Sequence, residues 1–340
     1  MAKLKRINLA LQGGGAHGAF TWGVLDRLLE EERIEVAGIS GTSAGALNGA
    51  AFKAGWLMGG REGARDNLDW LWGRIGAVQD MRMPVWMAGV MPAPALVSDV
   101  LQMSWPFTVM DTMSRVISPY AYGPFYSNPL RPVVERFSYD KVCADRGPSF
   151  CVCATNVHSG KIRVFTGDEI SSESLLASAC LPTLFQAVEI DGEHYWDGGY
   201  TGNPALFPLF APGLPDDIVI VNINPLERAE VPRAAHEIQN RINEISFNSS
   251  LLRELRAISF VQRLIAEGAI TEGAMKRVLV HMIADDDLMR ELSVATKLLP
   301  NPYLLGRLKE AGRAAADRFL ADHFDDLNVS STTDLKEMFG

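Results

Sequence analysis

Ser43 is the side chain of this sequence best placed for nucleophilic chemistry. It stands between Gly41 and Gly45 in a GxSxG motif, after an apolar segment, 34–40, and before a run of small helix-forming residues, 46–54. This pattern is typical of a nucleophile elbow, a sharp strand-to-helix turn whose glycines keep neighbouring backbone away from the serine hydroxyl. GxSxG alone is a weak signal, and an ordinary glycine-rich helix start is the alternative.

A glycine-rich turn near the N-terminus is the first candidate partner of this serine. It lies between an apolar segment, 7–11, that predicts a buried strand and a segment, 19–31, that predicts a helix. Its glycines are Gly13, Gly14, Gly15 and Gly18. Consecutive glycines at a strand-to-helix junction let backbone N–H groups converge on one point, which suits a phosphate or the oxyanion of an acyl-transfer intermediate.

The same glycines satisfy GxGxxG, so a dinucleotide-binding module is an alternative. That fingerprint expects an acidic residue at the end of the second strand to hold the ribose. Here that strand ends near Ser40, and Glu35 stands at its other end. A phosphate-binding Walker loop would need Gly-Lys-Ser/Thr after the glycines, and His17-Gly18-Ala19 does not supply it. We therefore favour an oxyanion-binding loop.

Asp197 is the second candidate partner. It precedes Gly198 and Gly199 and ends a segment, 188–197, that predicts a short hairpin with its turn at 191–192. A lone Asp-Gly is more often the cap of a turn than a catalytic group. Beside a nucleophile elbow and a glycine loop, a catalytic role for the aspartate becomes the favoured interpretation.

Together these motifs resemble the patatin-like phospholipase family, whose hallmarks are a glycine-rich oxyanion loop, GxSxG and a late Asp-Gly-Gly/Ala, in that order. Two further matches are the small-residue segment 177–185, which leads to Pro and Phe, and Asn203-Pro204. The resemblance covers roughly residues 5–225. It implies a three-layer α/β/α hydrolase fold with a mainly parallel central sheet and, here, a helical C-terminal extension.

The resemblance also implies a mechanism. Ser43 would attack an ester carbonyl, Asp197 would act as general base without a histidine, and N–H groups of Gly13, Gly14, Gly15 and Ala44 would hold the oxyanion. A carboxylate with a pKa of about 4 is a weak base at neutral pH, so burial or strong oxyanion binding must compensate. Each donor contributes on the order of 3 kcal/mol. The implied substrate is a phospholipid or lysophospholipid, and neither a cofactor nor a metal is expected.

Three alternatives to this mechanism stay open. A conventional triad would need a histidine, for which His194 is the best candidate; His281 is better explained as a core or edge residue. A catalytically silent lipid-binding or regulatory protein would keep the fold without needing the Ser-Asp pair. An esterase acting on other long-chain esters or polyesters would share the chemistry. His17 replaces a basic residue of the family, and it is expected either to bind a headgroup when protonated or to pack at the helix start.

We expect a catalytic domain over residues 1–225 and a mainly helical extension over 226–340. Segment 81–129 is rich in Met and Pro and predicts either a lid with an acyl-chain channel or ordinary core packing. In the extension, Arg233 to Glu267 predicts a long helix with one buried face; its apolar positions are Ile238, Ile242, Ile245, Leu252, Leu255, Ile258 and Val261. A strand over 276–283, a helix over 303–324 and a polar, mobile tail from 325 follow.

Composition limits the partners and the compartment. The 340 residues, 47% hydrophobic and 21% charged, are enough for one large α/β core. A net charge of −9 argues against nucleic acid and against electrostatic adhesion to anionic membranes. The four cysteines fit core packing rather than disulfides or zinc. With neither a signal peptide nor a transmembrane helix expected, we predict a cytoplasmic protein, for which peripheral membrane contact and a homodimer are both open and the sequence does not set the oligomeric state.

Overall fold

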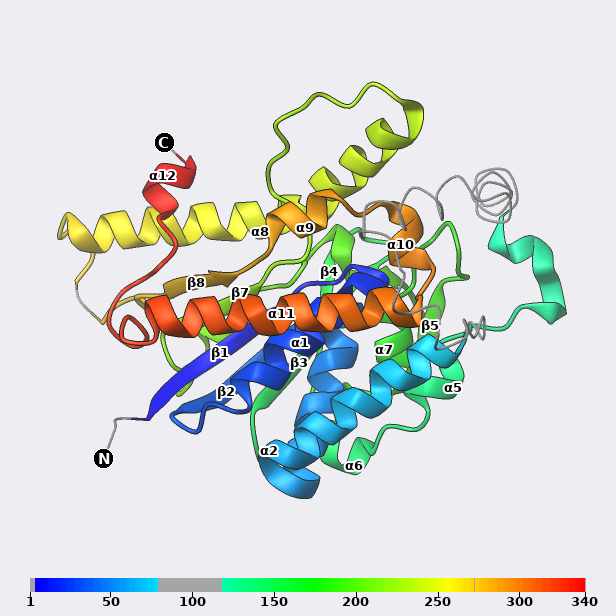
Figure 1. The fold of residues 1–340 in the computed structure, drawn as a ribbon, viewed down its shortest axis with the longest axis horizontal. Coiled ribbons are helices and arrows are strands. Elements are labelled where there is room, and N and C mark those ends of the chain that lie inside the picture. The colour runs from blue at the N-terminus through cyan, green and yellow to red at the C-terminus, as the bar shows by residue number, and fades with distance from the viewer. Residues whose placement is uncertain (1–3, 79–117, 272, 340) are drawn as a thin grey trace.

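A mainly parallel sheet organises the chain (Figure 1). The computed structural model describes residues 4–78, 118–271 and 273–339. The strands of these residues are β1 (Lys5–Leu11), β2 (Ile34–Thr42), β3 (Ser149–Asn156), β4 (Ile162–Thr166), β5 (Val188–Ile190), β6 (Glu193–Asp197), β7 (Asp217–Val221) and β8 (Leu279–Ile283). They follow the order β5-β6-β3-β2-β1-β7-β8, with β4 paired to β3.

The helices connect and cover these strands. The α-helices described are α1 (Gly18–Leu28), α2 (Ala44–Val78), α5 (Arg131–Val134), α6 (Tyr139–Val142), α7 (Ser172–Ser178), α8 (Ala235–Ala266), α9 (Asp286–Arg290), α10 (Val294–Leu298), α11 (Pro302–His323) and α12 (Leu335–Phe339). Short 3-10 helices are η1 (Gly15–His17), η3 (Pro119–Phe125), η4 (Gly167–Glu169), η5 (Gly198–Tyr200) and η6 (Phe207–Phe210). The elements expected around the glycine loop, the elbow and the Asp197 hairpin are all present.

Strand pairing divides the sheet into a parallel part and an antiparallel edge. β1 pairs in parallel with β2 and β7, β2 with β3, and β7 with β8. β6 pairs antiparallel with β3 and forms the predicted hairpin with β5. The strand predicted over 276–283 is β8, at the opposite edge of the sheet. Part of the C-terminal extension is therefore a strand of the central sheet.

Alternating side chains of the strands face two different helical layers. Along β1, Ile7, Leu9 and Leu11 join an apolar cluster with residues of α1, α2 and α11. Ala10 points to the other side and joins a cluster with residues of η6, α8 and α12. This period of two is what a sheet buried on both faces requires. The three-layer α/β/α architecture with a mainly parallel sheet is thus confirmed.

The tail from residue 325 is packed, so the prediction of a mobile tail was wrong. The N–H groups of Thr332 and Thr333 donate to the carbonyl of Val280, and the N–H of Val280 donates to Ser331. Leu335, in α12, is only 3% exposed. Because β8 is an edge strand, its outer N–H and C=O groups need partners, and the polar tail supplies them.

The prediction of one buried face along the long helix holds only for its second half. Leu255 and Ile258 are buried against the sheet. Ile238, Ile242 and Ile245 are 42%, 53% and 54% exposed. Figure 1 shows the first turns of α8 rising away from the sheet, so periodicity alone could not tell where the helix leaves the core.

The Met- and Pro-rich insertion predicted over 81–129 lies mostly outside the described residues, which resume at 118. No helix in the described ranges is long and apolar enough to span a bilayer.

Helices α1 and α11 approach each other closely through two glycines. A Cβ on Gly23 would lie within 2 Å of the carbonyl oxygen of Lys309, and one on Gly312 would lie 2.0 Å from that of Phe20. Real Cβ atoms do not come so near backbone, so a larger residue must push the helices apart. Gly306, also on α11, has open space around its Cβ direction.

We predict opposite effects for two glycine-to-alanine changes in α11. Gly312→Ala should lower the free energy of unfolding by about 1–3 kcal/mol because the added methyl overpacks the helix contact. Gly306→Ala is the matched control, and it should leave stability unchanged or raise it by up to about 1 kcal/mol through helix propensity. Urea unfolding of both variants measures this; equal effects would contradict the close packing.

Candidate active site

Two strand ends bring the glycine loop to the elbow serine. β1 and β2 run in parallel, and Leu11 pairs with Gly41, so the segments that follow both strands emerge at the same edge of the sheet. A Cβ on Gly13 would lie 2.7 Å from the Cβ of Ser43 and 2.9 Å from the carbonyl oxygen of Thr42. The loop therefore contacts the serine directly, and a side chain at position 13 would close that space.

Ser43 sits on the sharp strand-to-helix turn that the sequence predicts. β2 ends at Thr42, α2 begins at Ala44, and Ser43 has a φ of 53°, in the left-handed region that non-glycine residues seldom adopt. A Cβ on Gly45 would lie 2.1 Å from the carbonyl oxygen of Leu11. Gly45, two positions after the serine, is thus required for the turn to pack on the end of β1. Gly41 and Gly18 make comparably close contacts, to the backbone of Ala46 and to the Cβ of Ala44.

Ser178 holds the backbone of this turn. The N–H of Ser43 donates to the hydroxyl of Ser178 over 2.8 Å, and that hydroxyl donates to the carbonyl of Cys153 over 2.6 Å. Ser178 belongs to the segment 177–185 that the sequence singled out, although its role was not foreseen. The two hydrogen bonds connect the elbow to α7 and to β3, the strand beside β2.

Asp197 reaches the serine through the neighbouring strands. It is the last residue of β6 and pairs with Ala154 of β3, while the adjacent Cys153 pairs with Thr42 of β2. Asp197 is only 1% exposed, its carboxylate accepts the N–H of Gly199 over 2.7 Å, and the nearby hydroxyl of Ser43 acts on its pKa as a hydrogen-bond donor. Ser43 itself is 8% exposed.

Burial dominates the ionisation of Asp197. Desolvation raises the pKa of its carboxyl from 3.8 to about 7, against the opposing effects of the hydrogen bonds from Gly199 and Ser43. Desolvation penalises the charged form, so the buried carboxylate binds a proton more tightly than it would in water. A group with a pKa near 7 is an effective proton acceptor at neutral pH.

The residues after Asp197 are enclosed by the C-terminal part of the chain. A Cβ on Gly198 would lie 2.2 Å from the carbonyl oxygen of Cys153, and one on Gly199 would lie within 2 Å of the ring of Phe247, on α8. The Phe247 ring also packs against Tyr200, with ring centroids 5.3 Å apart. The C-terminal extension therefore helps to desolvate Asp197.

The N–H groups of the glycine loop divide into engaged and free donors. The N–H of Gly13 donates to Oδ1 of Asn203 over 2.6 Å, so Gly13, predicted as an oxyanion donor, has no hydrogen left for an oxyanion. Within the described residues the N–H groups of Gly14 and Gly15 have no acceptor. Ala44 is the first residue of α2, where a helical N–H has no partner one turn back. Three of the four predicted donors are thus free.

A cluster of side-chain amides supports the glycine loop from behind, and sequence reasoning missed most of it. Gln12 accepts the N–H groups of Ile223 and Asn224, and Asn224 donates to the carbonyl of Gly13 over 2.9 Å. Asn248, on α8, accepts from Gln12. One signal was available: Asn224 follows β7, whose carboxyl end lies at the same sheet edge as those of β1 and β2.

The three histidines considered from the sequence make other contacts or point elsewhere. His17 is 1% exposed, its Nε2 lies 2.8 Å from the hydroxyl of Thr296, and burial together with Lys297 lowers the pKa of its ring well below the usual value. Burial favours the packing role over headgroup binding. His281 is a core residue that hydrogen-bonds Asp217, as expected. His194 precedes Asp197 by three positions on β6, so the two side chains point to opposite faces.

The remaining polar groups of the described part of the chain do not form a metal centre. No group of three or more His, Cys, Asp or Glu in these residues is arranged to hold a metal ion. The four cysteines are free; Cys151, Cys153 and Cys180 are buried, in agreement with the core packing expected from the sequence.

A comparison with family models identifies one match. The family described as Patatin-like phospholipase matches residues 9–210, which include the glycine loop, the elbow and Asp197. None of the curated proteins matches the chain.

Solved structures give weaker similarities. VipD from Legionella pneumophila is 12% identical with a TM-score of 0.44, over 94% of this chain and 67% of that one. The type III effector ExoU is 14% identical with a TM-score of 0.35, over 96% of this chain and 54% of that one. ExoU of Pseudomonas aeruginosa in complex with SpcU is 11% identical with a TM-score of 0.35, over 93% and 53%. The chain thus spans about half the length of ExoU, and scores this low carry no argument about function.

The raised pKa of Asp197 predicts how stability depends on pH. Between its unfolded value of 3.8 and its folded value of about 7, the folded state holds a proton that the unfolded state has released. Stability therefore falls as pH rises through this window. Asp197→Asn removes this dependence. Relative to wild type, the variant should therefore be about 3 kcal/mol more stable at pH 8 than it is at pH 5. Urea unfolding at both pH values tests this, and a difference independent of pH would contradict the burial of a titrating carboxylate.

Proposed function

The chain belongs to the patatin-like phospholipase family, and we propose that it hydrolyses acyl esters of lipids with Ser43 as nucleophile and Asp197 as general base. The observation that carries the proposal is the buried carboxylate of Asp197 beside Ser43, with a pKa that burial raises to about 7 against the lowering effect of the Ser43 hydroxyl. Membership of the family is shown by the match over residues 9–210, more than half of the 340 residues.

The reaction would proceed in two steps. In acylation, Oγ of Ser43 attacks the ester carbonyl carbon while its proton passes to Asp197. The tetrahedral intermediate collapses, the ester C–O bond breaks, and the leaving alcohol takes the proton from Asp197. In deacylation, Asp197 takes a proton from water, the resulting hydroxide attacks the acyl-enzyme, and the serine regains its proton as the fatty acid leaves.

The elevated pKa of Asp197 removes the main objection to a carboxylate acting alone. An aspartate at its ordinary pKa would accept a serine proton poorly, whereas a pKa near the working pH balances basicity against the fraction ionised. Among the described residues no hydrogen bond joins a histidine to Asp197 or Ser43. The backbone N–H of Gly199 orients the Asp197 carboxylate, a role that the third member of a triad plays for its histidine. These contacts favour the dyad over a triad with His194.

The free amides near Ser43 are the proposed oxyanion hole. The N–H groups of Gly14 and Gly15 lack acceptors, and that of Ala44 belongs to the first residue of α2, directly after the nucleophile. Each donor that reaches the developing oxyanion contributes on the order of 3 kcal/mol to lowering the barrier. The fixed backbone needs no rearrangement when the charge appears, which is why such donors are effective.

The proposed substrate class is phospholipid or lysophospholipid. Family membership supports a lipid ester, and the net charge of −9 favours substrates presented in neutral or zwitterionic rather than anionic lipid surfaces. A catalytically silent lipid-binding protein would have no need for a strained serine at φ 53° beside a buried carboxylate.

We predict a pH profile that identifies the base. For turnover of a chromogenic acyl ester, kcat/KM should rise with pH up to about 7, because Asp197 must be ionised to accept the serine proton. Ser43→Ala should abolish turnover. Asp197→Asn should lower it by at least about 100-fold, the usual share of general-base catalysis. His158→Ala and His194→Ala are controls, since both rings lie against each other outside the site.

Several results would contradict the proposal. Retained activity in Asp197→Asn, or loss of activity in His194→Ala with the fold intact, would replace the dyad with another base. Wild-type turnover of short-chain or non-phospholipid esters without release of fatty acid from phosphatidylcholine or lysophosphatidylcholine would move the substrate class to other acyl esters. Binding to phosphatidylcholine vesicles without any turnover would favour the lipid-binding alternative.

A further inference from the structure

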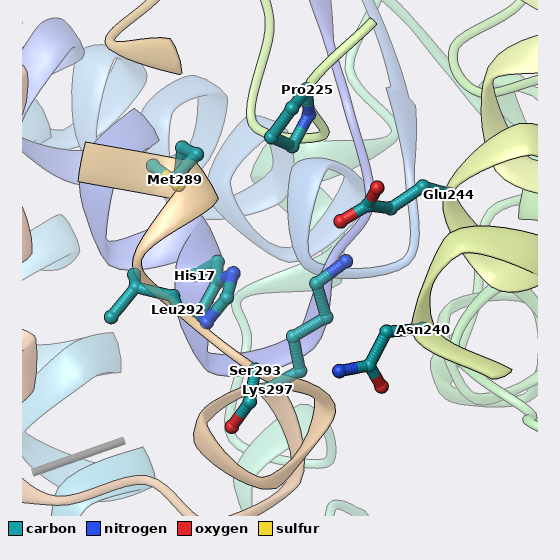
Figure 2. Close-up of a pocket in the computed structure, with 8 residues that line it drawn as sticks. All are labelled: His17, Pro225, Asn240, Glu244, Met289, Leu292, Ser293 and Lys297. Carbon is teal, nitrogen blue, oxygen red and sulfur yellow. The ribbon is translucent and has the colours of Figure 1, made fainter. Parts of the chain in front are cut away.

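Lys297 lies behind the glycine loop, beside a small cavity (Figure 2). The residue belongs to α10, a short helix in the C-terminal part of the chain that contacts η1. Figure 2 shows its side chain extending between His17 and Glu244, with the ammonium group turned toward Glu244. The cavity has a volume of about 10 Å³, room for about one water molecule. Nothing in the two-step mechanism uses this lysine.

A chain of hydrogen bonds joins Lys297 to the glycine loop. The ammonium of Lys297 donates to Oδ1 of Asn224 over 2.8 Å. Nδ2 of Asn224 then donates to the carbonyl of Gly13 over 2.9 Å and to Oε1 of Gln12 over 3.1 Å. Asn224 and Gly13 are buried or nearly so, which keeps water from competing for these contacts.

The ammonium holds the accepting end of the Asn224 amide. A carboxamide has one accepting and one donating end, and the carbonyl of Gly13 and Oε1 of Gln12 both take the donating end of Asn224. An ammonium can only donate, so it requires Oδ1 on its own side and leaves Nδ2 for the carbonyl of Gly13. Without the charge on Lys297, Oδ1 of Asn224 loses the charged donor that holds it, and the amide is less firmly positioned against the loop.

The carbonyl of Gly13 is half of the peptide group that carries a proposed oxyanion donor. In a planar trans peptide, the C=O of Gly13 and the N–H of Gly14 point in opposite directions and rotate together. Holding the carbonyl toward Asn224 therefore fixes the N–H of Gly14 on the other side. A hydrogen bond accepted at the carbonyl also polarises the peptide and strengthens its N–H as a donor, by an estimated 10–30% per bond.

We propose that Lys297 is a positioning residue for oxyanion stabilisation, because it orients Asn224 and thereby the Gly13–Gly14 peptide. This rests on the proposed ester hydrolysis by Ser43. Backbone packing supports it independently, since the carbonyl oxygen of Lys297 would lie 2.3 Å from a Cβ on Gly15, so α10 contacts the loop without intervening atoms.

The charge state of Lys297 is set by its surroundings. Desolvation lowers the pKa of its amine to about 8, opposed by Glu244 and assisted by Arg228. Glu244 is itself paired with Arg228 and Arg241, and it makes no ion pair with Lys297 within 4 Å. The His17 ring also faces the ammonium and is held neutral by burial. As pH rises through about 8 the ammonium becomes a neutral amine, which is a weaker donor and holds Oδ1 of Asn224 less firmly.

The test compares Lys297→Met, Lys297→Arg, Asn224→Ala and the double variant Lys297→Met/Asn224→Ala, with Lys336→Met as an exposed-lysine control. We expect Lys297→Met to lower kcat by about 10- to 100-fold with little change in KM, because small displacements of catalytic groups cost up to about 100-fold. Lys297→Arg should restore most of kcat and, unlike wild type, keep it above pH 8. If Lys297 acts through Asn224, the double variant should lose no more than the worse single variant.

A readout that does not need turnover separates this inference from the proposed function. Hydrogen exchange of the peptide containing residues 12–17 should become faster in Lys297→Met and stay unchanged in Lys336→Met. Unchanged exchange and unchanged kcat in Lys297→Met would overturn the positioning role even where Ser43 is confirmed as the nucleophile. Additive losses in the double variant would also overturn it. So would a loss of kcat in Lys297→Met that a loss of global stability fully accounts for. An inactive wild type with faster exchange in Lys297→Met would support the loop contact and reject the esterase.

Discussion

The burial of the Asp197 carboxylate beside Ser43 is the constraint on which the account depends. Ionising a carboxylate that is kept from water costs free energy, and this cost raises the pKa of Asp197 to about 7. The surrounding structure maintains it: β6 ends at Asp197 against β3, the ring of Phe247 covers Gly199, and one backbone N–H supports the charge. The same desolvation that opposes stability at neutral pH would supply the basicity that the proposed serine nucleophile needs.

Parallel pairing brings the other half of the site to this carboxylate. Because β1 and β2 run in parallel and Leu11 pairs with Gly41, the glycine loop and the elbow meet at one sheet edge. The loop is held by amides that come from after β7 and from α8, and by Lys297 of α10. The C-terminal part of the chain, expected as an extension packed on a catalytic domain, therefore contributes a sheet strand and much of the support of the site.

Much of the fold, and the turns that carry the candidate site, could be predicted from sequence, because their signals are local. GxSxG, the glycine run and the Asp197 hairpin each specify a turn with its own backbone geometry. The supporting contacts are not local: Asn203 takes the N–H of Gly13, and Lys297 reaches the loop from nearly 300 positions away. The tail and the first half of α8 were mispredicted because periodicity and polarity do not reveal which surfaces tertiary packing leaves uncovered.

Covalent labelling with a fluorophosphonate tests the central claim most directly. The probe phosphonylates only an activated serine, and mass mapping locates it. The account predicts a single label on Ser43, a labelling rate that rises with pH through about 7, and slow labelling of Asp197→Asn that lacks this rise. A label on another residue, or labelling of Ser43 at equal rates in wild type and Asp197→Asn, would contradict activation of the serine by the buried carboxylate.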